Sequence, residues 1–567
     1  MFKFGFYEKE ITTLLCCGVP GYFSIRRGCD VLDRLYARAV VIEESGKKVA
    51  ILSIDGLHPK TDVCDEIVRR AVEEEKVAEA RHIIETVKEK KGVKISADNT
   101  DPEQYKLAMA KRLVGFLDST PEKLNVPVQC KYKSIKKEIF TMDSITITKK
   151  LNVKRQYDVI VCGGGVAGVA AAVTAANDGH SVLIIEKSNI LGGLATLGLI
   201  NLFVPMCNGR GKQIIFGLCE KWARLSAEYG YDTIPEEWKN GEPKEPTNIR
   251  YIQRFSPHIF ALQLTEEITK SGADILFDCI ACEPVMDGNV CKGVITESKS
   301  GTEYYACKML IDVTGDCDVL RRGGVPVVTG ENFFTYSAKM ITLASCEKAV
   351  KEKNIYRAFT GISGGGINLF GDNQPDDVPK WSGLTVEEVT DYLIRNQHLV
   401  LEKLKETDRF SRDITHLPFM PQFRTTCRLN GDYALKVSDA YKHFDDSICA
   451  INDFEHRDHL FEVPLRCITR KDYPNMLTAG RSASGVGYGW DLLRVIPPAI
   501  ITGQAAAKTA CMAIEDKTNV ADVNISALQS KLEKADVMVH FPDEYVPEDK
   551  TVVIHGKNTA EIDGGHI

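Results

Sequence analysis

Residues 157–187 combine an apolar strand, a glycine-rich turn, an alanine-rich helix and a second apolar strand. The runs 158–162 and 182–186 are short and mostly apolar, which is typical of strands buried on both faces of a parallel sheet. Residues 166–178 between them are mainly alanine and valine and predict a buried helix. We therefore expect a strand–helix–strand unit with the glycine turn between its first strand and its helix.

A different pattern precedes this unit. Two β-rich runs around the polar turn Glu43–Lys48 predict a hairpin over residues 35–57. The charged stretch 62–90 predicts a helix, a second helix is expected to end near Leu117, and residues 126–151 are again β-rich. Residues 1–152 are therefore predicted to form a small α+β domain.

The sequence after residue 200 alternates between β-rich segments and more polar, mixed segments. β-rich runs return at 274–296 and 307–313, whereas 201–265 and 331–461 are mixed and more polar. We predict an α/β fold in which a central domain (153–200, 266–330 and 462–540) carries an inserted cap domain (201–265 and 331–461) that faces the substrate. Residues 541–567 are predicted to be a C-terminal tail.

The amino-acid composition is that of a folded globular protein. A chain of 567 residues, 44% hydrophobic and 26% charged, is long enough for two or three folding units. The net charge of −7 comes with no lysine and arginine block, so no nucleic-acid partner is expected. The expected partners are small molecules.

The sequence predicts no membrane span and no export. The most apolar stretch, Val495–Ile514, is interrupted by prolines, Gly503 and Lys508. At the N-terminus, Glu8 and Glu10 precede a short apolar run, the wrong order for a secretory signal. The 18 cysteines are scattered through apolar segments, as expected of buried thiols in a reducing compartment. A cytoplasmic location is expected.

The glycine turn has the spacing of a dinucleotide-binding turn, Gly163-x-Gly165-x-x-Gly168. Glycine allows the tight turn and the close approach of a pyrophosphate, and the N-terminus of the helix that begins with Val166 and Ala167 points free N–H groups at that anion. Glu186 follows 18 residues after the last glycine, where its carboxylate can accept the ribose hydroxyls and disfavours a 2′-phosphate.

Four further segments resemble FAD-dependent oxidoreductases of the glutathione-reductase type. They are the glycine pair in Leu191–Thr196, the turn Thr314-Gly315-Asp316, the segment Leu477–Arg481 and the distal piece Leu492–Ala499. The resemblance spans roughly residues 155–540 and implies a Rossmann-like FAD-binding domain with FAD as cofactor. It implies cofactor contacts from Gly163, Gly165, Val166, Ala167, Gly168, Glu186, Lys187, Gly192, Gly193, Ala195, Thr196, Thr314, Gly315, Asp316, Gly480, Arg481, Arg494, Pro498 and Ala499.

The distal piece leads into a helix predicted from Ile500 to about Ala513. Pro497 and Pro498 mark the start of that helix, because proline costs nothing in a first turn. Its N-terminus, aimed at the flavin pyrimidine edge, would stabilise the charge of the reduced flavin, and Arg494 could add to that field. Arg494 as a surface ion-pair residue is the alternative.

Residues for substrate binding follow from the same resemblance. Residues 424–433 match the arginine-rich RETRR…GEY segment of the family, with Thr425 and Cys427 as departures, and Arg466 matches as well. Guanidinium groups bind carboxylates and polyols well. The candidate catalytic residues are Arg424, Arg428, Tyr433, Arg466, Tyr488 and Asp491. Alternatively, the arginines pair with an internal acid such as Asp432 or Glu462.

One departure from the family affects the expected chemistry. Gly487 stands where many members have a histidine, so Tyr488 or Asp491 would have to act in its place, or the substrate must differ. The run Ser484–Asp491 is rich in glycine and aromatic residues and could equally be a flexible flap over the flavin ring.

No metal site is predicted. Cys279-x-x-Cys282 lies in a β-rich run, where the two side chains would face opposite ways, and no second such pair suggests an iron–sulfur cluster. His456-x-x-His459 would suit a metal ion if a third ligand were near, but a solvated helix face is the interpretation we favour.

The leading functional hypothesis is an enzyme that transfers a hydride between flavin N5 and a small polar organic substrate. An electron-transfer flavoprotein subunit with a redox partner is the alternative. In a third hypothesis the N-terminal unit dominates, because residues 18–57 resemble the start of neutral/alkaline ceramidase-type domains. Only His58 is near, whereas a zinc hydrolase needs several ligands, so a structural or homo-oligomeric role is expected for that unit.

Overall fold

The computed structural model describes residues 3–10, 36–44, 47–54, 148–368 and 371–563. The chain forms two compact units, Met1–Ile145 and Thr146–Ile567. The described part of the first unit is an antiparallel sheet of β1 (Lys3–Glu10), β2 (Tyr36–Glu44) and β3 (Lys47–Ile54), in that order. The predicted hairpin is confirmed, since Glu44 pairs with Lys47. The two helices expected before Leu117 lie outside the described residues.

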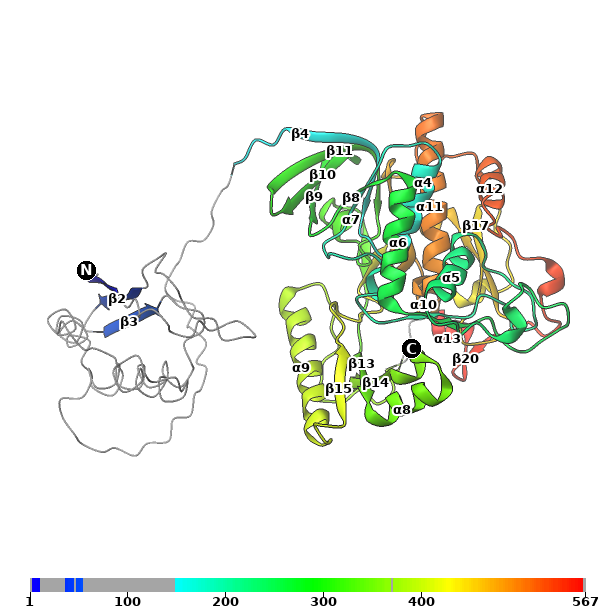
Figure 1. Cartoon of the computed structure of the whole chain (residues 1–567). Helices are drawn as coiled ribbons and strands as arrows, with labels where there is room; N and C mark the ends of the chain where they lie inside the picture. Colours follow the sequence, from blue (N-terminus) through cyan, green and yellow to red (C-terminus); the bar gives the residue numbers. More distant parts are fainter. Residues whose placement is uncertain (1–2, 11–35, 45–46, 55–147, 369–370, 564–567) are drawn as a thin grey trace. The chain divides into compact units, whose positions relative to one another are not determined.

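A seven-stranded sheet organises the second unit (Figure 1). Its parallel strands are β4 (Val153–Cys162), β5 (Val182–Ile185), β8 (Asp274–Leu276), β11 (Gly301–Asp312) and β19 (Met476–Thr478), in the spatial order β8-β5-β4-β11-β19. This is the 3-2-1-4-5 order of dinucleotide-binding sheets. The antiparallel strands β9 (Ile280–Asp287) and β10 (Val290–Ser298) extend it along the first half of β11.

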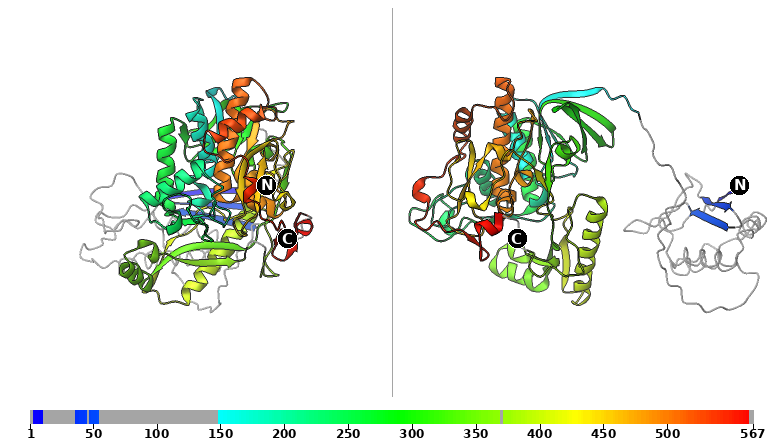
Figure 2. Two further views of the ribbon diagram at one scale, coloured as in Figure 1. Left: turned by 90° about the vertical axis from the view of Figure 1, so that its right-hand side faces the viewer. Right: turned by 180° about the vertical axis from the view of Figure 1, so that it is seen from behind.

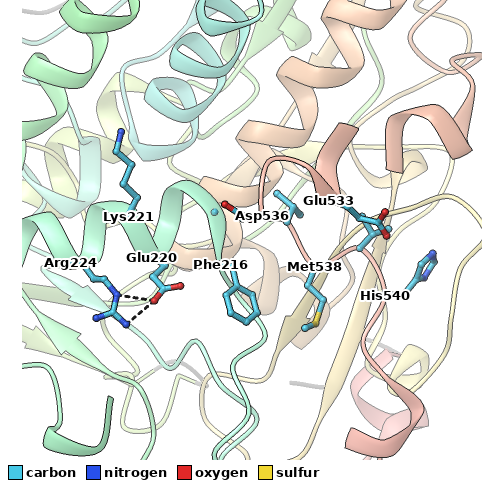
Figure 3. A pocket seen from close by; sticks show the side chains of 11 residues that line it. Phe216, Glu220, Lys221, Arg224, Glu533, Asp536, Met538 and His540 are labelled. Carbon is cyan, nitrogen blue, oxygen red and sulfur yellow. Dashed lines mark hydrogen bonds and ion pairs between the residues drawn. The ribbon is translucent and has the colours of Figure 1, made fainter. Parts of the chain in front are cut away.

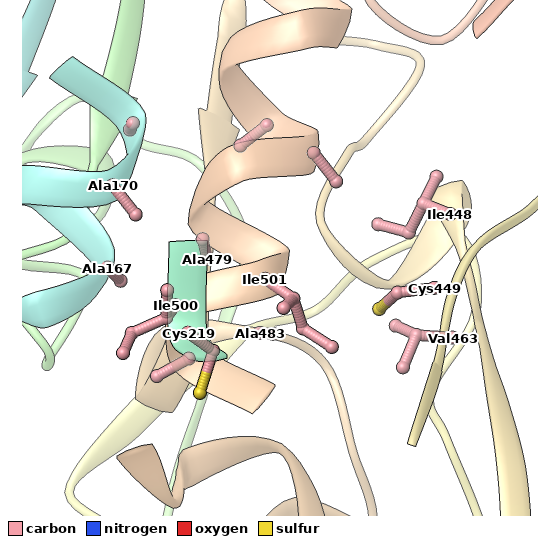
Figure 4. Packing of buried hydrophobic residues seen from close by; sticks show 14 of the residues in the cluster. Ala167, Ala170, Cys219, Ile448, Cys449, Val463, Ala479, Ala483, Ile500 and Ile501 are labelled. Atoms are coloured by element: carbon pink, nitrogen blue, oxygen red, sulfur yellow. The ribbon is translucent and has the colours of Figure 1, made fainter. Parts of the chain in front are cut away.

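Two buried helices cover one face of this sheet. α4 (Val166–Asn177) and α11 (Ile496–Asp516) pack against each other, and α6 (Pro257–Ser271) lies beside α4 (Figures 1 and 2). A Cβ atom on Gly503 would lie 2.3 Å from the carbonyl oxygen of Ala167, so the close helix–helix approach requires glycine. Figure 4 shows α11 between Ala170 of α4 and Ile448 of the strand β17 (Ser447–Asn452).

The predicted cap segment 201–265 belongs to this core instead, which corrects the domain prediction. Its aromatic side chains Phe203, Trp222, Trp238 and Tyr251 are fully buried in the same cluster as α4 and α11. They come from β6 (Leu202–Phe203), α5 (Gly217–Tyr229) and the neighbouring loops. The strands β17 and β18 (Leu460–Pro464) share this core too. Burial of large aromatic surfaces outweighs the polar average of the segment.

A second lobe is built from an antiparallel sheet and two helices. The sheet has the order β14-β13-β15 (Thr360–Gly366, Thr335–Thr342 and Arg412–His416), and α8 (Leu343–Glu352) and α9 (Val386–Lys405) accompany it. Its own core contains Tyr336, Trp381 and Tyr392, and Figure 2 shows the lobe apart from the large sheet. This lobe lies within the segment 331–461, and its role as a cap that faces the substrate stays a prediction.

Shorter elements connect these layers. They are α7 (Asp318–Arg322), β12 (Val327–Thr329), β16 (Cys427–Leu429), α10 (Tyr488–Arg494), α12 (Ile525–Glu533), β7 (Gln253–Arg254), β20 (Val553–Ile554), β21 (Lys557–Asn558) and α13 (Thr559–Asp563). None of the described helices combines the length and the apolar composition that crossing a bilayer requires.

Candidate cofactor and substrate site

The glycine turn lies where the strand order reverses, at the carboxyl ends of β4 and β11. The amide of Val313 donates to the carbonyl of Cys162 at 2.9 Å, which joins the two strand ends. A Cβ on Gly163 would lie 2.5 Å from the carbonyl oxygen of Val313, and one on Gly168 would lie 1.9 Å from that of Gly163. At Gly165, by contrast, a Cβ would meet nothing within 4 Å. Two glycines are thus required by packing, and the third faces the open space that a pyrophosphate needs.

Glu186 closes this turn from the end of β5. Its side chain is buried, one carboxylate oxygen accepts from the amide of Gly164 at 2.6 Å, and the other accepts from the amide of Ser188 at 2.8 Å. The carboxylate therefore lies beside the phosphate turn, as binding of the ribose requires. Lys187, the next residue, is exposed and acts on Asp316 by charge attraction.

The second glycine pair lies directly against the first turn. Gly192 donates its amide to the carbonyl of Gly164 at 2.8 Å, and both Gly192 and Gly193 have positive φ angles, +105° and +54°. A Cβ on Gly193 would lie 3.2 Å from the Cα of Gly165. Thr196 holds the loop by donating its hydroxyl to the carbonyl of Leu191 at 2.7 Å. The two glycine segments therefore lie directly against each other.

Asp312, which the sequence analysis did not single out, holds the Thr314–Asp316 turn. Its fully buried carboxylate accepts from the amide and hydroxyl of Thr314 and from the amides of Val319 and Leu320 at the start of α7. Burial raises the pKa of Asp312 to about 6, against the lowering effect of these hydrogen bonds. An aspartate directly after the apolar run 309–311 was the available signal.

Arg481 joins the Thr314–Asp316 turn to the segment after β19. Its guanidinium lies 3.0 Å from a carboxylate oxygen of Asp316 and donates to the carbonyl of Gly315 at 2.9 Å. Gly480 has a φ of +62°, and a Cβ there would lie 3.1 Å from that of Ala499 and 3.2 Å from that of Ala167. The first turns of α11 and α4 therefore meet on either side of Gly480. Pro498 lies in the first turn of α11, as predicted.

The candidate substrate residues fall into two groups. In the first, the guanidinium of Arg424 donates to the carbonyl of Asn368 at 2.8 Å, and Asp491 pairs with Arg494 at 2.5 Å. Burial, and then repulsion from Arg494, lowers the pKa of Arg424 to about 10. Burial raises the pKa of Asp491, although Arg494 opposes the shift. Arg494 thus forms an ion pair, as the alternative interpretation required, but one that is largely buried, with 15% of the arginine side chain exposed.

Arg428 is buried on the neighbouring strand β16. Its guanidinium lies 5.5 Å from the ring centre of Trp490 and donates to the carbonyl of Leu429 and the hydroxyl of Ser484. Among the described residues no partner is found for its Nε atom. Burial lowers the pKa of Arg428.

The second group, Arg466 and Tyr433, is already paired with internal acids. Arg466 forms a two-pronged ion pair with Asp446, at 2.9 and 3.0 Å, and lies over the ring of Tyr433. The hydroxyl of Tyr433 donates to both carboxylate oxygens of Asp439 at 2.8 Å. An internal acid does pair with Arg466, but it is Asp446 and neither Asp432 nor Glu462.

The run 484–491 is mostly buried. It enters α10, in which Tyr488 and Asp491 are both buried, and the ring of Tyr488 stacks on Phe454 at 5.7 Å. The histidines His456 and His459 do not lie on a solvated helix. They belong to the loop between β17 and β18, and both bond to the carboxylate of Asp453.

The cysteines are thiols throughout the described residues. All thirteen of them are free, and Cys279 is buried whereas Cys282 is partly exposed. This contrast agrees with side chains that face opposite ways.

Comparison with known proteins identifies the family. A family model described as FAD dependent oxidoreductase matches residues 158–359 and 371–532, more than half of the chain and every predicted site residue. This chain belongs to the FAD-dependent oxidoreductase family. The likeness of residues 18–57 to ceramidase-type domains has no support in these comparisons and stays a prediction.

Individual relatives of this FAD-dependent oxidoreductase share only part of its length. A digeranylgeranylglycerophospholipid reductase of Methanospirillum hungatei is 30% identical over 145 residues, 25% of this chain and 34% of that protein. An NADH:fumarate oxidoreductase of Klebsiella pneumoniae is 54% identical over 39 residues, 7% of this chain and 4% of that protein. The chain thus spans about a third or less of either relative.

Among solved structures, a geranylgeranyl bacteriochlorophyll reductase-like protein of Thermoplasma acidophilum is 14% identical. The match covers 69% of this chain and 94% of that one, with a TM-score of 0.31. A TM-score this low supports no conclusion about function.

FAD fits the residues that surround the glycine turn. The open space at Gly165 and the N-terminus of α4 suit a pyrophosphate, and the carboxylate of Glu186 suits a ribose. The N-terminus of α11 suits the electron-rich flavin ring. These features come from three separate segments of the family match.

A separate surface pocket of about 620 Å³ lies between α5 and the segment that follows α12 (Figure 3). Lys221 and Arg224 line it together with Glu220, Glu533 and Asp536, and Arg224 pairs with Glu220 at 2.8 Å. None of the predicted cofactor or substrate residues lines this pocket.

Proposed function

We propose that this FAD-dependent oxidoreductase transfers a hydride between flavin N5 and a small polar substrate with an anionic or oxygen-rich group. Bound FAD supplies the redox chemistry. The side chains of the protein bind and orient the substrate and accept or donate the proton that accompanies hydride transfer.

The charge of Arg424 carries this proposal. The carboxylate of Asp491 attracts Arg424 but is already paired with Arg494 at 2.5 Å. No acid of the described residues lies within 4.0 Å of Arg424. The exposed Glu455 adds only a weaker attraction. A partly buried guanidinium without its own anion is costly, and a substrate carboxylate or similar group would relieve that cost. Arg428, with its unpartnered Nε, supports the same conclusion.

Asp491 is the proposed proton carrier. Burial raises the pKa of its carboxyl group, which brings proton exchange closer to neutral pH. The hydroxyl of Tyr488 instead donates to Asp453. Burial, and then the charge of Asp453, raises the pKa of Tyr488, so the tyrosine stays protonated. Its proposed role is to orient the substrate, not to abstract a proton from it. Arg466 and Tyr433 have no part in this proposal, because acids already bind them.

Anaerobic reduction of the holoprotein tests the proposal. Sugars, hydroxy acids, amines and amino acids are added one at a time while the flavin absorbance is followed. Bleaching by one class of anionic or polyhydroxylated compound is expected. If dithionite bleaches the flavin but no compound does, and a redox protein does, the protein is an electron-transfer flavoprotein subunit instead.

A further inference from the structure

Three ligand-type side chains meet on the loop between β17 and β18. Asp453 is wholly buried, and His456 and His459 follow it on the loop. The Nδ1 atom of His456 lies 3.1 Å from one oxygen of Asp453, Oδ2, and the Nδ1 atom of His459 lies 3.2 Å from the same oxygen. The sequence alone showed two histidines and no third ligand. The fold supplies the third.

The spacing of these atoms matches a metal coordination sphere. Ligands at zinc distances of roughly 2.0–2.2 Å in a tetrahedral arrangement are about 3.3 Å apart. Two imidazoles and one carboxylate are also the protein ligands of many zinc and iron(II) sites that keep further positions open. All three donor atoms lie within 4.8 Å of one another.

The other carboxylate oxygen of Asp453 is held as a metal-binding carboxylate usually is. Oδ1 accepts from the hydroxyl of Tyr488 at 2.6 Å and from the amides of Glu455 and His456 at 2.8 and 3.0 Å. Arg250 donates to the carbonyl of Asp453 itself. These contacts leave Oδ2 directed to the histidines and fix its position.

Solvent and further donors reach the cluster from one side. The side chain of His456 is 28% exposed, whereas those of His459 and Asp453 are 10% and 0% exposed. Glu455 and His555 flank His456, and their donor atoms with that of His456 also lie within 4.8 Å of one another. Glu455, His456 and His555 thus form a second trio that shares His456, and water can reach the exposed side of the cluster.

A second cluster of the same composition lacks this convergence. In it, His443 and His540 bond to different oxygens of Glu462, Oε1 and Oε2, and Oε2 also accepts the amide of Phe444. Each histidine there already has its own acceptor. This cluster provides a matched control.

We propose that Asp453, His456 and His459 bind a divalent transition-metal ion of the zinc class, with water completing its coordination. The proposal does not depend on the hydride-transfer reaction. It differs from a simple hydrogen-bonded cluster in one measurable respect, the uptake of a metal ion at these three side chains.

Metal content and affinity of the full-length holoprotein, purified without a histidine tag, test the proposal. Protein treated with a chelator is exposed to Zn²⁺, Mn²⁺, Ca²⁺ or, without oxygen, Fe²⁺, and bound metal is measured by mass spectrometry and titration calorimetry. We expect one equivalent of Zn²⁺ to bind, and no Ca²⁺. Wild-type protein that takes up no stoichiometric transition metal would overturn the proposal without any variant.

Variants locate the metal. His456→Gln and His459→Gln should each weaken zinc binding by more than about 100-fold, and Tyr488→Phe, which removes only the support of Asp453, by roughly 10- to 100-fold. His443→Gln should leave zinc binding unchanged. Flavin content, measured on every variant, separates loss of metal from loss of fold, and His456→Gln, at the exposed side, is the variant that folding should tolerate best. Full zinc affinity in both folded histidine variants, or its loss in His443→Gln, would place the metal elsewhere.

Discussion

The hydroxyl of Tyr488 donates a 2.6 Å hydrogen bond to the buried carboxylate of Asp453. This bond joins α10, which follows the predicted cofactor residues Gly480 and Arg481, to the loop between β17 and β18. Burial alone would raise the pKa of Asp453, but hydrogen bonds from His456, His459 and Tyr488 outweigh it and lower the pKa. The carboxylate is therefore charged, and its donors stabilise it.

Tyr488→Phe should lower the free energy of unfolding by about 1–3 kcal/mol, because a buried charged acceptor loses a donor while the ring packing on Phe454 remains. Urea unfolding measures the change. Tyr473→Phe is the control, since the hydroxyl of Tyr473 donates to an uncharged carbonyl, that of Gly324, in an exposed setting. Equal losses in the two variants would mean that the Asp453 bond is no stronger than an ordinary one.

Gly165→Val should fold normally and lose FAD. A Cβ at this position meets no protein atom within 4 Å, so the added side chain would occupy only the space proposed for the pyrophosphate. Circular dichroism and flavin absorbance measure the two effects separately. Gly361→Val, also at an open position but on β14, should keep both fold and flavin. Normal flavin content in Gly165→Val would remove the phosphate site from this turn.

Arg424→Ala should retain FAD and lower the rate of flavin reduction by substrate by on the order of 100-fold, the scale of a lost charge-assisted contact. Stopped-flow absorbance under anaerobic conditions measures the rate. Arg395→Ala removes an arginine that pairs with Asp391 on the surface of α9, and it should reduce at the wild-type rate. If Arg424→Ala also reduces at that rate, the substrate binds elsewhere.

Stability should fall as the pH rises through the pKa of His443. Burial alone would lower this pKa, but hydrogen bonds to Glu462 and then Asp543 outweigh burial and raise it above the ordinary 6.5. Protonated His443 thus stabilises the fold fully below about pH 6.5, and this stabilisation disappears as the pH passes the raised value. Unfolding free energies of wild type between pH 6 and 9 should fall more steeply than those of His443→Gln. His398→Gln, at an exposed site on α9, should leave the slope unchanged.

Acid-labile sulfide should be absent from the purified protein. Cys279 is buried next to the end of β5, with its amide bonded to the carbonyl of Glu186, and Cys282 is partly exposed three residues later, so the pair does not present two thiolates to one cluster. Colorimetric sulfide analysis tests this expectation. Stoichiometric sulfide that disappears in Cys279→Ser would contradict it.

The glycine turn and the helix start of the predicted cofactor site could be recognised in the sequence because their requirements are local. Gly163 and Gly168 have no room for a side chain, Gly165 borders open space, and Pro498 suits the first turn of a helix. Such demands restrict the residue type at each position and leave a pattern with fixed spacing. The strand–helix–strand periodicity likewise follows from burial on both faces of the sheet.

The partners of the charged side chains were decided only by the tertiary structure. Tyr488 and Asp453 are 35 residues apart, and Arg481 and Asp316 are 165 residues apart. Periodicity shows which face of an element is buried, but it does not show which loop ends beside which helix. For that reason Arg466 proved to be paired with Asp446, and Asp453 emerged as the missing neighbour of two histidines.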